Sequence, residues 1–189
     1  QVTVEGKTYK LDEPFMVIAT QNPIETKGTF DLPEAQLDRF LVKTSMGYPT
    51  FDESVEILSR KINGINVGSC ETVDSALIAN AREELASVYV HKDLMGYATQ
   101  ICEATRKDKT VILGASPRAM IALIRVAQGY AAISERDYVL PDDIAAVFRP
   151  AIGHRLMLRQ DAKLKGISPD EILGEILRTT AVPYKGKRK

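Results

Sequence analysis

The sequence contains no tryptophan, only two cysteines and two histidines, and no excess of charge of either sign. Cys70 and Cys102 are too few and too far apart for a disulfide scaffold, and the histidines do not complete the spacing of a structural zinc site. The 25 basic residues balance 25 acidic ones, and the basic cluster is confined to 185–189. This balance disfavours a protein that binds nucleic acid or membrane surfaces through a broad basic face.

Long apolar runs are absent as well. No stretch approaches the roughly 18–20 apolar residues that span a bilayer, and Gln1–Glu5 lacks the basic start and apolar segment of a signal peptide. Together with the few cysteines, these absences predict a cytoplasmic protein without a membrane span. The 189 residues suffice for one large or two small domains, yet the chain begins without Met in a strand-like segment. We therefore expect it to be part of a longer protein.

The first part of the chain has the pattern of an α/β domain. Two strand-like segments flank Glu5-Gly6, where glycine accepts the positive φ of a tight hairpin. Phe15–Ala19 is a continuous apolar run, which predicts a strand buried on both faces. A loop over 21–33 precedes a short predicted helix at Glu34–Arg39 and a strand-like run at Phe40–Ser45.

Beyond residue 49 the apolar period changes from 2 to 3.6, which predicts helices. One helix is expected within 72–88. The next should bury one face, formed by Leu94, Tyr97, Ala98, Ile101, Cys102 and Thr105. Cys102 is therefore interpreted as a core residue and not as a reactive thiol.

Proline at the first helical position predicts three further helix starts, at Pro117, Pro141 and Pro169. The stripe of Met120, Ile124, Ala127 and Ala131 should face the core from the first of these. Pro150 should kink or end the second, because it removes a donor and clashes with the preceding turn. The predicted organisation is an α/β segment over 1–49 followed by an all-helical domain over 50–189.

Gly6-Lys7-Thr8 is similar to the end of a phosphate-binding P-loop but lacks its context. A P-loop needs a glycine five residues earlier, where this chain has Gln1, and a helix after it, where this chain is strand-like. The acidic pair that ends a Walker B strand is also missing, since Phe15–Ala19 continues into Thr20-Gln21-Asn22. The sequence thus predicts a hairpin here.

Three polar residues are candidates for a site, each with a plain alternative. Asn22 follows a predicted strand end, where an amide can hold a water or a phosphate oxygen, but Asn-Pro is also an ordinary turn. Arg39 ends a short helix and is either a solvated charge or a guanidinium that reaches across a subunit boundary. Arg118 lies in a first helical turn, where the helix dipole disfavours a cation; an anion site would explain it, and so would tolerated exposure.

Several strings resemble the MoxR family of AAA+ ATPases over essentially the whole chain. They are Phe15–Pro23, Leu32–Phe40, Gly47–Pro49, Gly114–Ala119, Leu140–Ile144 and His154-Arg155. One departure is Gly153, where the family more often has Arg. The resemblance implies the distal half of an AAA+ P-loop core sheet, α/β in class, plus an all-α lid.

The resemblance also implies roles for the three candidates. Asn22 matches sensor 1, which positions the attacking water or the γ-phosphate. Arg39 matches the arginine finger, which acts on nucleotide held by the neighbouring subunit. Arg118 matches sensor 2, which reaches from the lid to the phosphates. In such proteins the Walker A and B segments precede the hairpin at Gln1–Leu11, and the given sequence does not contain them.

The resemblance implies ATP hydrolysis by a ring, expected to be a hexamer, that drives chaperone-like remodelling or maturation of partner proteins. ATP and Mg²⁺ are the expected cofactors of the longer protein. A von Willebrand factor A domain partner is expected. The given chain alone is expected to be inactive and to hold no tightly bound nucleotide, because a P-loop enzyme needs the missing ligands.

Three alternatives remain at this stage. The chain could belong to the ATPase subunit of a magnesium chelatase, which shares this branch of the architecture. It could be a non-catalytic binding module whose helical domain docks a partner. A nucleic-acid motor is the third, and the lack of a basic face away from the C-terminal tail counts against it.

Overall fold

The computed structural model describes residues 1–21, 32–64 and 71–183. Its helices are α1 (Glu34–Leu37), α2 (Phe51–Ile62), α3 (Ser75–Ser87), α4 (Lys92–Lys107), α5 (Pro117–Ile133), α6 (Pro141–Ile152), the 3-10 turn η1 (Gly153–Arg155), α7 (Gln160–Leu164) and α8 (Pro169–Thr179). Its strands are β1 (Val2–Val4), β2 (Lys7–Tyr9), β3 (Val111–Leu113) and β4 (Met157–Leu158). Within these described ranges, no helix is long and apolar enough to cross a membrane.

The hairpin predicted at the start of the chain is confirmed. β1 and β2 pair antiparallel, with Val2 opposite Tyr9 and Val4 opposite Lys7. Glu5 and Gly6 form the turn with φ of 50° and 79°, the two positive values that a type I′ turn needs. Because Lys7 lies in a strand, the Gly-Lys-Thr string has no helix to present phosphate-binding amides.

The two other predicted strands of the α/β part are not formed. Phe15–Ala19 has no strand partner in the described residues, and Met16 and Ile18 are 79% and 76% exposed. Phe40–Ser45 is likewise extended without a ladder, although the Lys43 N–H donates to the Pro150 carbonyl at 2.9 Å. A strand requires a neighbour for its backbone groups, and the described residues supply only two two-stranded ribbons, β1–β2 and β3–β4.

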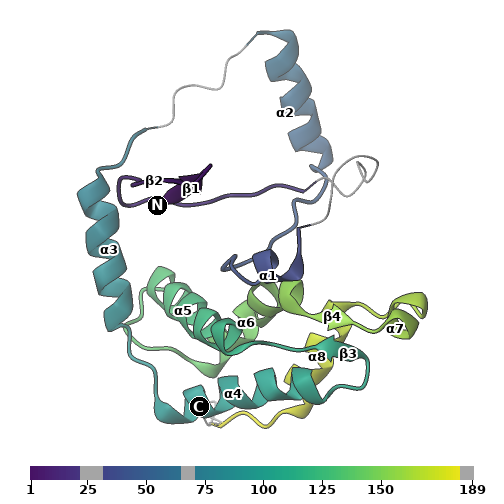
Figure 1. Ribbon diagram of the computed structural model, residues 1–189. Helices are drawn as coiled ribbons and strands as arrows, with labels where there is room; N and C mark the ends of the chain where they lie inside the picture. The colour runs from purple at the N-terminus through teal and green to yellow at the C-terminus, as the bar shows by residue number, and fades with distance from the viewer. Residues whose placement is uncertain (22–31, 65–70, 184–189) are drawn as a thin grey trace, which may run out of the picture.

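The first two long helices contribute no buried side chain. α2 begins with a capping box between Thr50 and Glu53. Its apolar face, formed by Phe51, Val55, Leu58 and Ile62, is at least half exposed at every position. Figure 1 shows α2 standing apart from the other helices. α3 is capped by Asp74 and also has no buried residue, although Leu85 near its C-terminal end packs against the core.

The core is built from α4, α5, α6 and α8, with the β3–β4 ribbon beside them (Figure 1). Every buried side chain of the described residues lies between Val88 and Ile176. α4 buries the predicted face without exception: Leu94, Tyr97, Ala98, Ile101, Cys102 and Thr105. On α5 the predicted Ala127 and Ala131 are buried, while Met120 and Ile124 only pack against the core edge.

The predicted helix starts are confirmed. Of the two outcomes expected for Pro150, a kink or a helix end, the end at this residue is not observed. Ser116 and Ser168 cap α5 and α8, with proline following each of them. α6 does not end at Pro150 but continues to Ile152. A proline this close to the C-terminus removes one helical hydrogen bond only, and the chain then tightens into η1.

Candidate functional site

The structure places two of the three candidate residues on the surface. Arg39 lies in the turn after α1, and Arg118 is the second residue of α5; both are exposed. Asn22 lies outside the described residues. Arg118 therefore occupies the first helical turn that the sequence predicted.

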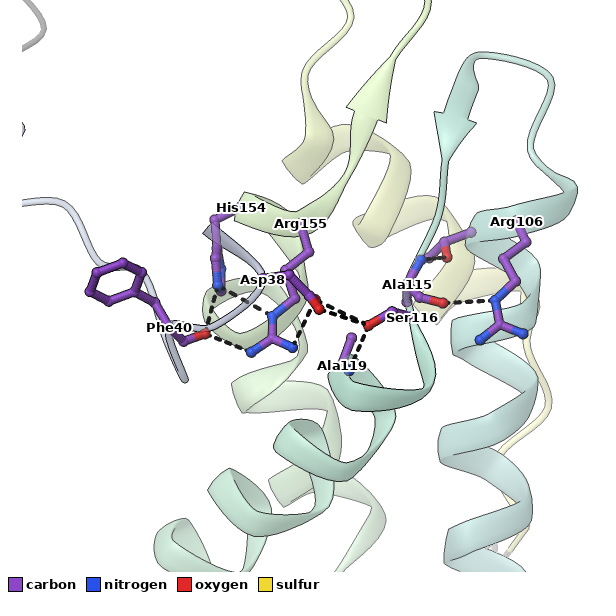
Figure 2. Close-up of polar contacts among 9 residues, drawn as sticks. Asp38, Phe40, Arg106, Ala115, Ser116, Ala119, His154 and Arg155 are labelled. Carbon is purple, nitrogen blue, oxygen red and sulfur yellow. Dashed lines mark hydrogen bonds and ion pairs between the residues drawn. The ribbon is translucent and has the colours of Figure 1, made fainter. Parts of the chain in front are cut away.

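A set of hydrogen bonds joins the neighbours of these two arginines. The Ser116 hydroxyl donates to the Asp38 carboxylate, at 3.0 Å from Oδ1 and 3.3 Å from Oδ2. Asp38 immediately precedes Arg39, and Ser116 lies two residues before Arg118. The contact thus links the α1 segment to the start of α5, across 78 residues of sequence (Figure 2).

Arg155, in η1, extends this contact. Its side chain is 2% exposed and donates through Nη1 to Asp38 Oδ1 at 3.3 Å and through Nη2 to the Phe40 carbonyl at 2.6 Å. One guanidinium therefore holds the residue before Arg39 and the residue after it, as Figure 2 shows. We call Asp38, Phe40, Ser116, His154 and Arg155 the polar joint.

His154 completes the polar joint. Its Nε2 lies 3.1 Å from the Phe40 carbonyl oxygen and 3.3 Å from Arg155 Nε, which donates to it. A protonated Nε2 satisfies the contact with Phe40, and an unprotonated Nε2 satisfies the contact with Arg155. Its Nδ1 is buried and makes no hydrogen bond. Burial lowers the pKa of His154; the Phe40 carbonyl opposes this effect, and the charges of Arg155 and Lys43 add to it. The imidazole is therefore neutral near pH 7.

The electrostatics around the polar joint favour an anion. Burial lowers the pKa of Arg155; Asp38 opposes that effect, and the positive charge of Arg118 lowers the pKa further. Arginine nevertheless stays protonated in proteins. Arg118 and Arg155 set two positive charges against the one carboxylate of Asp38, beside the N-terminus of α5, where the helix dipole adds to the positive potential.

Contacts with α4 fix the segment that leads to Ser116. Arg106 Nε donates to the Ala115 carbonyl at 2.7 Å, and the Ala115 N–H donates to Thr105 Oγ1 at 2.9 Å. A Cβ on Gly114 would lie 2.7 Å from the backbone nitrogen of Arg106, so this position has room only for glycine. Figure 2 shows these contacts on the side of Ser116 away from Asp38.

Cys102 takes no part in a site. It is fully buried in α4, and burial raises the pKa of its thiol to about 12, against the weaker effects of Arg106 and Arg155. The prediction that it is a core residue is confirmed. In the described ranges, 1–21, 32–64 and 71–183, no three His, Cys, Asp or Glu side chains gather as metal ligands.

Sequence reasoning did not assign a role to Asp38, His154 or Arg155, although it quoted all three within family strings. The ion pair joins residues 117 positions apart, so no local spacing signals it. One signal was available: Arg155 lies between Ile152 and Leu156, and a charge inside an apolar stretch suggests a buried partner.

Comparison with known families defines the class. Residues 1–42 match the family described as "ATPase family associated with various cellular activities (AAA)", and residues 103–176 match the AAA lid domain. The chain therefore joins the end of an AAA+ core to a helical lid, which confirms the predicted fold class.

Individual relatives narrow this to a family. The chain is 43% identical to the uncharacterized protein YeaC of Bacillus subtilis, over 97% of this chain and 58% of that protein. It is 38% identical to the chaperone MoxR1 of Mycobacterium tuberculosis, over 96% of this chain and 50% of that protein. A crystal structure of a putative ATPase from Cytophaga hutchinsonii superposes with a TM-score of 0.86 at 36% identity, over 97% of this chain and 58% of that one.

The chain belongs to the MoxR family of AAA+ proteins, as its resemblance predicted. It spans about half the length of the curated relatives named here.

Proposed function

We propose that this chain supplies the distal half of a nucleotide site, together with the lid, in a MoxR-type AAA+ ATPase that hydrolyses ATP as a ring and remodels or matures partner proteins. The observation that carries the proposal is that Arg39 and Arg118 are exposed, while the residues beside them are held together by the polar joint. An exposed guanidinium on a fixed backbone is suited to bind phosphate oxygens.

The residues have separate tasks in this proposal. Arg118, at the start of α5, contacts the phosphates of nucleotide bound in the same subunit. Arg39 points to nucleotide of the neighbouring subunit and stabilises the charge that develops on the transferred phosphoryl group. Asn22 orients the attacking water. Mg²⁺ bound with the nucleotide would offset the negative charge of the phosphates, and this chain is proposed to supply none of its ligands.

Two substitutions test the site in the full-length protein. Arg39→Ala should lower kcat by about 10³-fold or more and leave nucleotide binding intact, because the finger acts on the neighbour's transition state. Arg118→Ala should weaken nucleotide binding. The matched control is Arg125→Ala, an exposed arginine further along α5. Normal turnover by the Arg39→Ala protein would remove Arg39 from the site, and unchanged affinity and turnover would remove Arg118.

The isolated 189-residue chain is proposed to neither bind ATP tightly nor hydrolyse it. It would lack the P-loop amides and lysine that supply most of the phosphate contacts. Titration with a nonhydrolysable ATP analogue measures this directly. Binding at micromolar concentration would contradict the proposal.

The organisation around the site is proposed on the family resemblance. Residues 1–49 form the end of the AAA+ core and residues 50–189 the lid. The protein is proposed to act in the cytoplasm as a homo-oligomer, a hexamer, with a von Willebrand factor A domain protein as its partner. Light scattering of the full-length protein with and without ATP would test the ring, since a monomer under both conditions contradicts it.

A further inference from the structure

We propose that Asp38 and Arg155 are positioning residues: they fix, against the lid, the backbone from which Arg39 projects. This inference rests on the proposed function, in which Arg39 acts on a neighbouring subunit. It assigns a task to an ion pair between the buried Arg155 of the lid and the half-buried Asp38 of the α1 segment.

The geometry that supports this is a clamp around one residue. Asp38 and Phe40, on either side of Arg39, are both bound by the guanidinium of Arg155. Asp38 receives a second bond from Ser116, on another lid element. The exposed Arg39 side chain is left outside the clamp. The attachments thus constrain the backbone of Arg39 without occupying its guanidinium.

A second attachment follows three residues later. The Lys43 N–H donates to the carbonyl of Pro150, next to the end of α6. The segment from Asp38 to Lys43 is therefore tied to α5, α6 and η1 at successive points. These attachments hold the backbone on both sides of Arg39 against the lid.

Charge explains why both members of the pair are needed. Arg155 is nearly fully buried, and it also feels the positive charge of Arg118. Asp38 is the carboxylate that compensates it within the polar joint. Removing this carboxylate leaves a buried cation unpaired next to another cation, which favours release of the α1 segment from the lid.

Hydrogen exchange of the protein tests the clamp without reference to activity. The amides of Arg39, Phe40 and Lys43 are hydrogen bonded in the wild type. In Asp38→Asn we expect peptides covering 36–43 to exchange about tenfold faster, with α5 and α6 unchanged. Unchanged exchange in 36–43 would overturn the proposal.

The control for this experiment breaks a comparable ion pair elsewhere. Asp143 is 3% exposed and accepts from Arg136 at 2.6 and 2.7 Å, at the opposite end of α6 from η1. Asp143→Asn should lower stability and leave exchange of 36–43 at the wild-type rate. Equal acceleration by both variants would show a general loss of stability and would also overturn the proposal.

Kinetics of the full-length protein test the effect on Arg39. Asp38→Asn should lower kcat by about 10²-fold, the cost of a misplacement near 1 Å, and leave KM for ATP within about twofold. Added to Arg39→Ala, it should cause no further loss, because it acts through Arg39. A further loss in the double variant, or normal kcat in Asp38→Asn, would overturn the proposal.

A conservative variant separates positioning from charge alone. Arg155→Lys keeps the cation but cannot serve Asp38 and the Phe40 carbonyl with a planar fork, so it should resemble Asp38→Asn. Recovery of wild-type kcat in Arg155→Lys would overturn the clamp.

A second pair of variants replaces Asp38→Asn if circular dichroism shows that this protein is unfolded. The pair is Ser116→Thr and Ser116→Ala. Alanine loses the bond to Asp38 and should accelerate exchange in 36–43, which threonine should not; equal exchange in the two would overturn the proposal.

Failure of the proposed function is recognised separately. A wild-type full-length protein without ATPase activity, or an active Arg39→Ala protein, contradicts the proposed function and leaves the exchange result unaffected. An Arg39-dependent ATPase that is insensitive to Asp38→Asn contradicts only the inference made here.

Discussion

At the scale of single residues, His154 should make the stability of the protein depend on pH. Its pKa is lowered from the ordinary 6.5, chiefly by burial. The unfolded chain therefore binds a proton more readily than the folded protein as the pH falls below about 6.5. The free energy of unfolding should accordingly be constant above that pH and should fall as the pH approaches the lowered pKa of the folded state.

Denaturant unfolding between about pH 5 and pH 8 measures this dependence. His154→Gln keeps an amide donor for the Phe40 carbonyl and cannot titrate, so its stability should vary less with pH than that of the wild type. His91→Gln controls for the loss of a more exposed histidine. A His154→Gln protein with the full wild-type slope would show that another group causes it.

The sequence predicted correctly that Arg118 lies in the first turn of a helix, because the Ser-Pro pair at 116–117 indicates where that helix begins. It could not find the pairing of Asp38 with Arg155. A tertiary ion pair depends on how distant elements pack, and no periodicity or cap carries that information. The surroundings of Arg39 were therefore unpredictable, although Arg39 itself was named.

At the scale of elements, two glycines should respond to alanine in opposite ways, Gly114 between α4 and α5 and Gly96 inside α4. A methyl group on Gly114 would meet the backbone of Arg106 at 2.7 to 2.8 Å. Gly114→Ala should therefore lower the free energy of unfolding by about 2–3 kcal/mol or more. Gly96 lies within α4 with no atom within 4 Å of an added Cβ, so Gly96→Ala should raise it by about 0.5–1 kcal/mol.

Chemical denaturation of the two variants and the wild type measures both the expected decrease and the expected increase in the free energy of unfolding. If Gly114→Ala were as stable as the wild type, the close approach of the two segments would be wrong. The pair also separates a steric effect from helix propensity, since alanine is a better helix former than glycine.

Elements were predictable where the periodic face has a partner. The spacing in α4 named all six buried residues of that helix, and the caps of α5 and α8 named their starts. The same reasoning expected burial for Phe15–Ala19, and these residues are exposed. Periodicity shows that a segment has an apolar face; it does not show what covers that face.

At the scale of the whole molecule, burial is concentrated in one part of the chain. All buried side chains of the described residues lie between Val88 and Ile176, while α2 and α3 bury none. Helices without a packed face have little stability of their own. Limited proteolysis of the isolated chain should therefore cut before Val88 and leave a resistant product that extends to about residue 180.

Mass spectrometry of the digest identifies this product. The same digest of Asp38→Asn tests whether the polar joint protects the α1 segment. The protease should cut this segment sooner in Asp38→Asn than in the wild type. An early cut within α5 or α6 would contradict a single cooperative core.

One hydroxyl in this molecule restricts which sequences the fold accepts. Ser116 donates to Asp38 and at the same time accepts from the Ala119 N–H at 3.1 Å, so it serves as a bridge and as a helix cap. Aspartate, an equally good cap elsewhere, only accepts and would face another carboxylate. The two positions should thus vary together in evolution: homologues with an acid at position 38 are restricted to serine or threonine at position 116, and homologues free of that acid are open to every capping residue.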